Sequence, residues 1–247
     1  MTGETTNFLY PFIEGSETDA GSLLDDLARS ARGKWSQSAQ LRTATLEAHE
    51  PALARAAELM AERFAAGGRL FTFGNGGSAT DAEGVAQLYT RPPAAGMPLA
   101  ARSLVEDQAV ITALANDVGF DNVFSRQLIA HGQRGDIAMG FSTSGNSENL
   151  LAAFAQARRQ GLLTVGLSGY RGGRMAEPDS AVELCFVVGS DSVHRIQEAQ
   201  AAVTHALWRE VQARLASPGA GADRAERPGP EIAADPPPGG GEEEPAA

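Results

Sequence analysis

Two short loops rich in glycine and hydroxyl groups are the parts of this chain best suited to hold a ligand. The first loop, residues 74–78, reads Gly-Asn-Gly-Gly-Ser, and the second loop, residues 142–147, reads Ser-Thr-Ser-Gly-Asn-Ser. Each follows an apolar run typical of a strand and precedes a helical pattern. The first N–H groups of a helix lack partners within the helix and attract anions. Glycine lets a phosphate approach the backbone, and serine adds hydroxyl donors. The pattern therefore predicts two phosphate-binding loops.

The spacing of these loops excludes two common nucleotide-binding motifs. The chain has no G-x-x-x-x-G-K-[ST] sequence, and the first loop lacks the third glycine of a dinucleotide fingerprint. No lysine accompanies the first loop, which argues against a bound triphosphate. The loops therefore suit a phosphate group without a triphosphate.

Composition limits the remaining function classes. The 247 residues are 43% hydrophobic, enough for one good core, and the net charge of −11 argues against nucleic acid or an anionic membrane as partner.

The single cysteine, Cys185, lies in an apolar run, so we expect a buried small hydrophobe rather than a nucleophile. One cysteine allows no disulfide within the chain, and no run approaches membrane-spanning length or a signal peptide. We expect a cytoplasmic protein.

Periodicity divides the chain into four parts. Residues 1–20 form a flexible lead-in, residues 21–67 a helical hairpin, residues 68–215 an α/β domain, and residues 216–247 a disordered acidic tail rich in proline and glycine. After Ser217 there are seven acidic and two basic residues. Within the α/β domain, strands alternate with helices, which predicts a doubly wound parallel sheet with the loops at the strands' carboxyl ends. The predicted strands are 70–73, 98–104, 137–141, 163–167 and 182–188, and the predicted helices are 78–89, 107–115, 120–130, 147–160 and 193–215.

The stretch from about residue 70 to 215 resembles a sugar isomerase (SIS) domain of the phosphoheptose isomerase branch. The matching pieces are the two loops, Ala115-Asn116-Asp117, Phe124-Ser125-Arg126, Gly135-Asp136 and Arg195-Ile196-Gln197-Glu198. The resemblance implies a flavodoxin-like three-layer sandwich, and a helical hairpin that builds a homotetramer with sites at subunit interfaces. It also implies a phosphosugar ligand. The implied phosphosugar-binding residues are Asn75, Gly76, Gly77, Ser78, Ser142, Thr143, Ser144, Ser147 and Gln197.

The chain departs from the family at two positions of the helix after the first loop. Active isomerases carry there a histidine and, four residues on, a glutamate, where this chain has Gly84 and Leu88. In the family the glutamate is the general base and the histidine helps to hold zinc. Aldose–ketose isomerisation moves a proton between C1 and C2, so it requires a positioned base. Leu88 cannot supply one.

Two residues remain as candidates for proton transfer. Asp107 could replace the missing base, although a residue at this position could equally be a helix N-cap. His205 retains a family histidine and could act as an acid, as a base or as a hydrogen-bonding group for the sugar. It could also be packed without a role. Zinc needs about four ligands. Because only His205 and Gln197 remain, we expect neither a metal nor another cofactor.

The sequence leaves two main functions open. In the first, the protein binds a phosphosugar without isomerising it and acts as a sensor or adaptor. The resemblance includes such relatives, which bind the replication initiator, so a protein partner fits this function. In the second, it is an active isomerase of sedoheptulose 7-phosphate or a related sugar, with a relocated base. A third function is a helical scaffold that only oligomerises.

Overall fold

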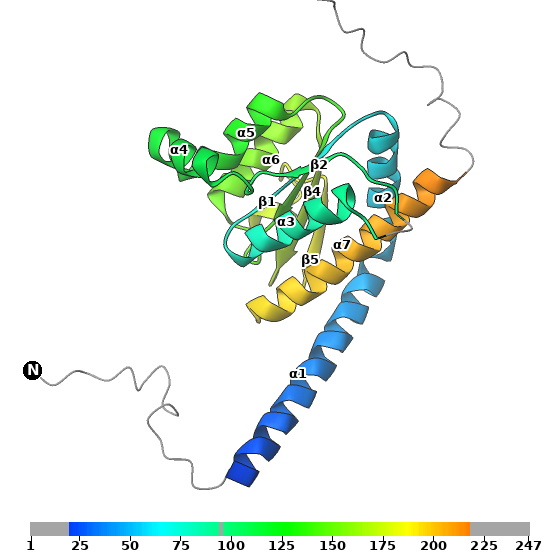
Figure 1. The fold of residues 1–247 in the computed structure, drawn as a ribbon, viewed down its shortest axis with the longest axis vertical. Helices are drawn as coiled ribbons and strands as arrows, with labels where there is room; N and C mark the ends of the chain where they lie inside the picture. Colours follow the sequence, from blue (N-terminus) through cyan, green and yellow to red (C-terminus); the bar gives the residue numbers. More distant parts are fainter. Residues whose placement is uncertain (1–19, 94–95, 218–247) are drawn as a thin grey trace, which may run out of the picture.

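The fold is described by a computed structural model for residues 20–93 and 96–217 (Figure 1). The predicted lead-in lies outside the described residues except for Ala20, where the first helix begins. The predicted tail lies outside them except for Ala216 and Ser217. Among the described residues, no helix combines the length and the apolar character needed to cross a membrane.

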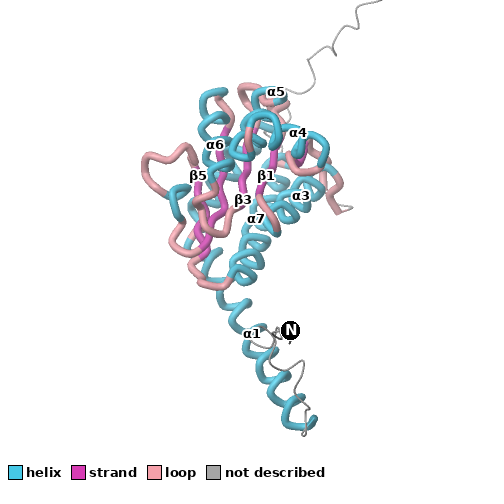
Figure 2. Tube along the Cα trace, turned by 90° about the vertical axis from the view of Figure 1, so that its left-hand side faces the viewer, coloured by secondary structure: helices cyan, strands magenta, loops and turns pink. Residues whose placement is uncertain are grey.

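Two helices precede the sheet, as predicted. Helix α1 spans Ala20–Ala48 and α2 spans Glu50–Ala65, so that only His49 separates them. Pro51 lies in the first turn of α2, where its missing N–H is not needed. The first part of α1 projects from the body as an arm (Figures 1 and 2), and its Leu24 and Trp35 are 65% and 74% exposed.

Five parallel strands form one sheet in the order β2-β1-β3-β4-β5, which confirms the predicted fold class. The predicted strand 98–104 is shorter than expected, with only three residues in β2. The strands are β1 (Leu70–Gly74), β2 (Ala101–Ser103), β3 (Ile137–Phe141), β4 (Leu163–Gly169) and β5 (Leu184–Val188).

Helices cover both faces of the sheet, giving three layers (Figure 2). Alternate residues of β1 point to opposite faces, as a strand requires. Leu70 packs with α2, α3 and α7, whereas Phe71 and Phe73 pack with α5 and α6. The remaining helices are α3 (Gly77–Thr90), α4 (Gln108–Val118), η2 (Phe120–Asn122), α5 (Val123–His131), α6 (Glu148–Gln160), η3 (Gly173–Ala176) and α7 (Val193–Ala216).

The direction of chain winding changes between β1 and β3. From β1 the chain first crosses to β2 at one edge, and it then returns to form β3 on the other side of β1. Gly74 at the end of β1 is in register with Phe141 at the end of β3, so both loops leave the sheet side by side. In open parallel sheets, ligands bind at such a switch point, beyond the carboxyl ends of the strands.

Cys185 lies in β5 and is partly buried. Burial raises the pKa of its thiol, and a contact of 3.5 Å with Ser168 Oγ only partly offsets this. The thiol therefore stays protonated at neutral pH, as expected for a packing residue.

Candidate functional site

The first loop joins β1 to α3 through a turn that requires glycine. A Cβ on Gly74 would lie 2.4 Å from the carbonyl oxygen of Ser78, and Gly76 has a φ of +57°. Gly76 is the N-cap residue of α3 and has no side chain to cap the helix, while the N–H groups of Ser78 and Ala79 donate to the carbonyls of Asn75 and Gly76 at 3.1 and 3.0 Å. Ser78 is buried in the first turn. Without a side-chain cap, the positive end of the α3 dipole remains available to an anion.

The second loop gathers three hydroxyl groups at the start of α6. Ser142 Oγ lies 3.4 Å from Ser144 Oγ and 3.2 Å from Ser147 Oγ, and it accepts a 3.1 Å hydrogen bond from the N–H of Gly145. Ser147 is the N-cap residue of α6, yet its side chain makes no capping bond. Thr143 is half-buried beside Ser142. The three hydroxyl groups thus converge at a place where an anion could accept hydrogen bonds from them.

A pair of amide side chains joins the two loops. Asn75 Nδ2 donates to Asn149 Oδ1, and Asn149 Nδ2 donates to Asn75 Oδ1, each at 2.9 Å. Asn75 belongs to the first loop, and Asn149 follows the second loop in the first turn of α6. The pair fixes the starts of α3 and α6 relative to each other.

The segment around η3 supports the second loop from the outside. The N–H of Met175 donates to the carbonyl of Gly145 at 3.0 Å, and the N–H of Arg174 donates to Asn146 Oδ1 at 2.9 Å. Gly145 has a φ of +69°, and a Cβ there would lie 1.9 Å from the carbonyl oxygen of Gly172. The Arg174 guanidinium pairs with Glu148. The shape of the loop is therefore held by both backbone and side-chain contacts with the η3 segment.

A seam between α3 and α7 leads away from the first loop. At the loop end, Gln197 Nε2 donates to Asp81 Oδ2 at 3.0 Å, and the same nitrogen lies 2.5 Å from the position of a Cβ on Gly77. At the far end, Gln212 bonds both the N–H and the carbonyl of Met97, at 2.8 and 3.0 Å. Gln197 therefore lies beside the first loop, and its role in binding a phosphosugar stays a prediction.

Asp81 is the residue of this site that the sequence reasoning missed. Its carboxyl group is half-buried, and burial raises its pKa, while the hydrogen bond from Gln197 lowers the pKa by less. A signal was present in the sequence, because residues three apart share one face of a helix and Asp81 follows Ser78 by three. An isolated aspartate on a helix nevertheless gives no indication that a glutamine over one hundred residues later will contact it.

The family's zinc site does not fit the residues found here. Gly84 is exposed with nothing within 4 Å of its Cβ position, and Leu88 is half-buried against the core. His205 is exposed, with its ring centre 5.5 Å from that of Trp208. Nowhere in the described ranges do three His, Cys, Asp or Glu side chains gather as a metal site would require.

Asp107 has a structural partner. Its side chain accepts a 3.1 Å hydrogen bond from the N–H of Val110 and caps α4. Helix α4 packs on the same side of the sheet as α5 and α6, whereas His205 lies on α7 at the other side. The fold therefore does not bring Asp107 and His205 together, and a catalytic role for Asp107 stays a prediction.

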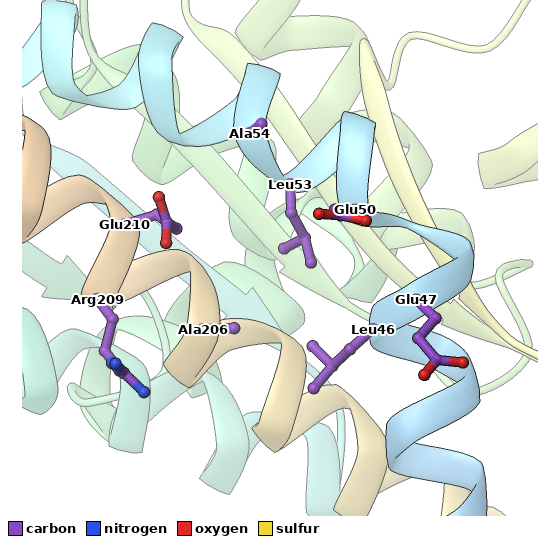
Figure 3. Close-up of a pocket in the computed structure, with 8 residues that line it drawn as sticks. All are labelled: Leu46, Glu47, Glu50, Leu53, Ala54, Ala206, Arg209 and Glu210. Carbon is purple, nitrogen blue, oxygen red and sulfur yellow. The ribbon is translucent and has the colours of Figure 1, made fainter.

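Two cavities help to delimit the site. A cavity of about 300 Å³ borders the first loop at Gly74, Asn75 and Gly76, and it continues to apolar side chains of α4 and α5. A larger cavity of about 540 Å³ lies between α7 and the junction of α1 with α2 (Figure 3). Its lining residues are Leu46, Glu47, Glu50, Leu53, Ala54, Ala206, Arg209 and Glu210. Because the larger cavity touches neither loop, its size does not make it the phosphate site.

Comparison with known proteins agrees with this geometry. The SIS domain pattern matches residues 35–169. The chain belongs to the SIS domain family. It is 42% identical over 168 residues to a phosphoheptose isomerase of Rhodospirillum rubrum, covering 68% of this chain and 88% of that protein. It is 38% identical over 181 residues to a phosphoheptose isomerase of Roseiflexus, covering 72% of this chain and 89% of that protein.

Solved structures of the same family share the fold of this SIS protein. The phosphoheptose isomerase GmhA of Neisseria gonorrhoeae superposes with a TM-score of 0.70 and 33% identity, over 76% of this chain and 99% of that one. The phosphoheptose isomerase of Francisella tularensis superposes with a TM-score of 0.68 and 31% identity, over 75% of this chain and 98% of that one. The resemblance to the phosphoheptose isomerase branch, and the fold implied by it, are thus confirmed.

Proposed function

We propose that this SIS protein binds a phosphorylated sugar and does not isomerise it by the family's chemistry. The observation that carries the proposal is the meeting of two helix N-termini without side-chain caps, α3 and α6, at the switch point of the sheet. Around them stand the hydroxyls of the second loop and the amide of Gln197. Membership of a family with phosphoheptose isomerases supports a sugar phosphate as ligand.

The absence of the family's base from its usual position supports a binding role. Leu88 places hydrocarbon there, and Gly84 places no side chain. A general base contributes about 10²–10⁴-fold to such a reaction, so its loss alone would nearly abolish turnover. The proposed protein needs no zinc or other cofactor. It would report ligand to a partner protein, in the cytoplasm.

Assembly into a homo-oligomer, expected as a tetramer, is part of the proposal. The exposed apolar residues Leu23, Leu24, Leu27 and Trp35 lie along the projecting part of α1 (Figure 1). Side chains of this size are usually covered in a stable protein. A second copy of α1 would cover them.

Binding and turnover are measured separately with sedoheptulose 7-phosphate. We expect the ligand at about 100 times its Kd to stabilise the folded protein by about 2.7 kcal/mol in a thermal unfolding assay. We expect turnover no higher than that of a heat-inactivated sample. Turnover clearly above that background would reject the non-catalytic function. A failure to bind sedoheptulose 7-phosphate, other sugar phosphates and inorganic phosphate would reject the phosphosugar site.

An active isomerase is the alternative, and one observation favours it. Asp81 offers a half-buried carboxylate with a raised pKa beside the first loop, and a raised pKa makes a carboxylate a stronger base. His205 would then be the second group. Replacing Asp81 by Asn and His205 by Ala separately tests this function, because each change should lower any measured turnover at least about tenfold.

A further inference from the structure

Asp81 occupies a distinctive place relative to the first loop. It lies three residues after Ser78, so one helical turn places both residues on the same side of α3. Its partner Gln197 reaches the start of α3, where its Nε2 would collide with any side chain on Gly77. The pair therefore lies directly against the N-terminus that would hold the phosphate.

The carboxylate of Asp81 has acceptor capacity that the protein does not use. An ionised carboxylate offers about four lone-pair sites. Within the described ranges, only Gln197 Nε2 donates to Asp81, and it does so to Oδ2 alone. Because the side chain is half-buried rather than enclosed, its remaining acceptor sites are open to water or to a ligand. A group left in this state beside a binding loop is suited to accept hydrogen bonds from a ligand.

We propose that Asp81 selects the ligand by accepting hydrogen bonds from sugar hydroxyls on the carbons next to the phosphate, while Gln197 holds the carboxylate in place. The inference rests on the proposed phosphosugar function and narrows it. The ligand is a polyhydroxylated sugar phosphate rather than inorganic phosphate or an apolar phosphate ester. Asp81 is thus a specificity-determining residue.

The negative charge of Asp81 determines which of the two ligands, a sugar phosphate or inorganic phosphate, is favoured. A carboxylate repels a phosphate bound at the adjacent helix N-terminus. Hydrogen bonds from hydroxyls to a carboxylate compensate for that repulsion, because bonds to charged groups are the stronger ones. Inorganic phosphate brings no sugar hydroxyls and meets only the repulsion. The same side chain therefore disfavours one ligand and favours the other.

The variant Asp81→Asn separates recognition from positioning. Asparagine keeps an oxygen that accepts from Gln197 Nε2, but it removes the charge and replaces the other acceptor by an NH₂ donor. We expect affinity for sedoheptulose 7-phosphate to fall about tenfold and affinity for inorganic phosphate to stay equal or rise, both measured by titration calorimetry. Glu83→Gln is the matched control. Glu83 is exposed two residues away, where it accepts a 3.3 Å hydrogen bond from Gln87, so both affinities should stay unchanged.

Each other outcome is decisive. Equal affinities for both ligands in Asp81→Asn and the parent would overturn the inference and leave the proposed function standing. A parallel loss for both ligands would also overturn it, because that pattern indicates a structural role. A parent protein that binds neither of these ligands nor any other sugar phosphate would overturn the proposed function and the inference together. Thermal unfolding without ligand establishes that the variant folds, and Asp81→Ala carries the same expectation if Asp81→Asn does not fold.

Discussion

Asn75 and Asn149 exchange two hydrogen bonds of 2.9 Å across the switch point of the sheet. Both amides use their donor and their acceptor on each other, which fixes the orientation of each side chain. Asn149 is 2% exposed, so water cannot replace a lost partner. The geometry of the two loops as a single site thus depends on this contact.

Replacing Asn75 by Ala tests that dependence. The change leaves the buried Asn149 amide unpaired, so we expect the free energy of unfolding to fall by about 1–3 kcal/mol in urea denaturation. We also expect weaker binding of inorganic phosphate, because the two loops are no longer held at a fixed position relative to each other. Asn116→Ala is the control, since Asn116 is exposed and its side chain donates to the neighbouring Asp117. A variant as stable as the parent would show that the amide pair is dispensable.

The second loop makes a separate prediction at Gly145. An alanine there would combine a φ of +69° with a Cβ 1.9 Å from the carbonyl oxygen of Gly172. Strain and overpacking of this kind cost about 3 kcal/mol together, so Gly145→Ala should unfold at a clearly lower temperature. Gly189→Ala provides the comparison, because its Cβ position is open and its φ is not positive. It should change stability by less than about 0.5 kcal/mol. Equal stability of the two variants would contradict the tight packing of η3 on the loop.

Sequence patterns predicted most of the fold because local signals agreed with one another. The apolar run 70–73 precedes a glycine-rich turn and a helical pattern, and β1 and α3 appear within one residue of the predicted bounds. The strand at 98–104 was overextended. Ala101–Ser103 pair with β1, and one flanking bond at each end, from Leu104 N–H to Thr72 and from Leu70 N–H to Ala100, completes the contact before the chain turns toward the cap of α4 at Asp107.

The site was predictable only where it follows one strand and one helix. The loop residues were identified from local spacing, and Gln197 from the family resemblance. The contacts that complete the site join residues distant in sequence, such as Gln197 with Asp81 and Arg174 with Asn146. Such pairs depend on how α7 and η3 pack on the sheet, which hydrophobic periodicity does not specify.

The exposed apolar residues on the projecting part of α1 predict that copies of the chain associate in a concentration-dependent way. Replacing Leu24 and Leu27 by Glu places charges on the exposed apolar side of that helix, so we expect the oligomer to dissociate toward monomers in sedimentation velocity. Ile129→Glu is the matched control, because Ile129 is 49% exposed on α5 and lies far from α1 in the chain. A parent that sediments as a monomer at all concentrations would refute self-association.

Restoring the family's side chains should create isomerase activity if their loss explains its absence. Gly84→His is sterically free, since nothing lies within 4 Å of its Cβ position, and leaving Gly favours the helix by about 0.5 kcal/mol. Leu88→Glu supplies the base but removes a half-buried apolar contact. With zinc added, the double variant should isomerise sedoheptulose 7-phosphate at least about 100-fold faster than the parent. The pair Gly84→His with Leu88→Gln has the same shape without the base and should stay inactive. Equal rates for both double variants would reject the explanation.

Asp81 also predicts how stability without ligand depends on pH. Because burial raises the pKa of this carboxyl group in the folded state, the folded protein binds the proton more tightly than the unfolded chain does. Stability from this group is therefore full below the unfolded pKa of about 3.9 and declines as pH rises through the folded pKa. Asp81→Asn removes the buried charge, so it should unfold at a higher temperature than the parent at pH 7. The difference should shrink as the pH falls through the folded pKa and vanish below the unfolded pKa of about 3.9, where the carboxyl group is protonated in both states. Glu83→Gln should show no such trend, and a variant less stable than the parent at pH 7 would mean that the carboxylate of Asp81 supports the ligand-free fold.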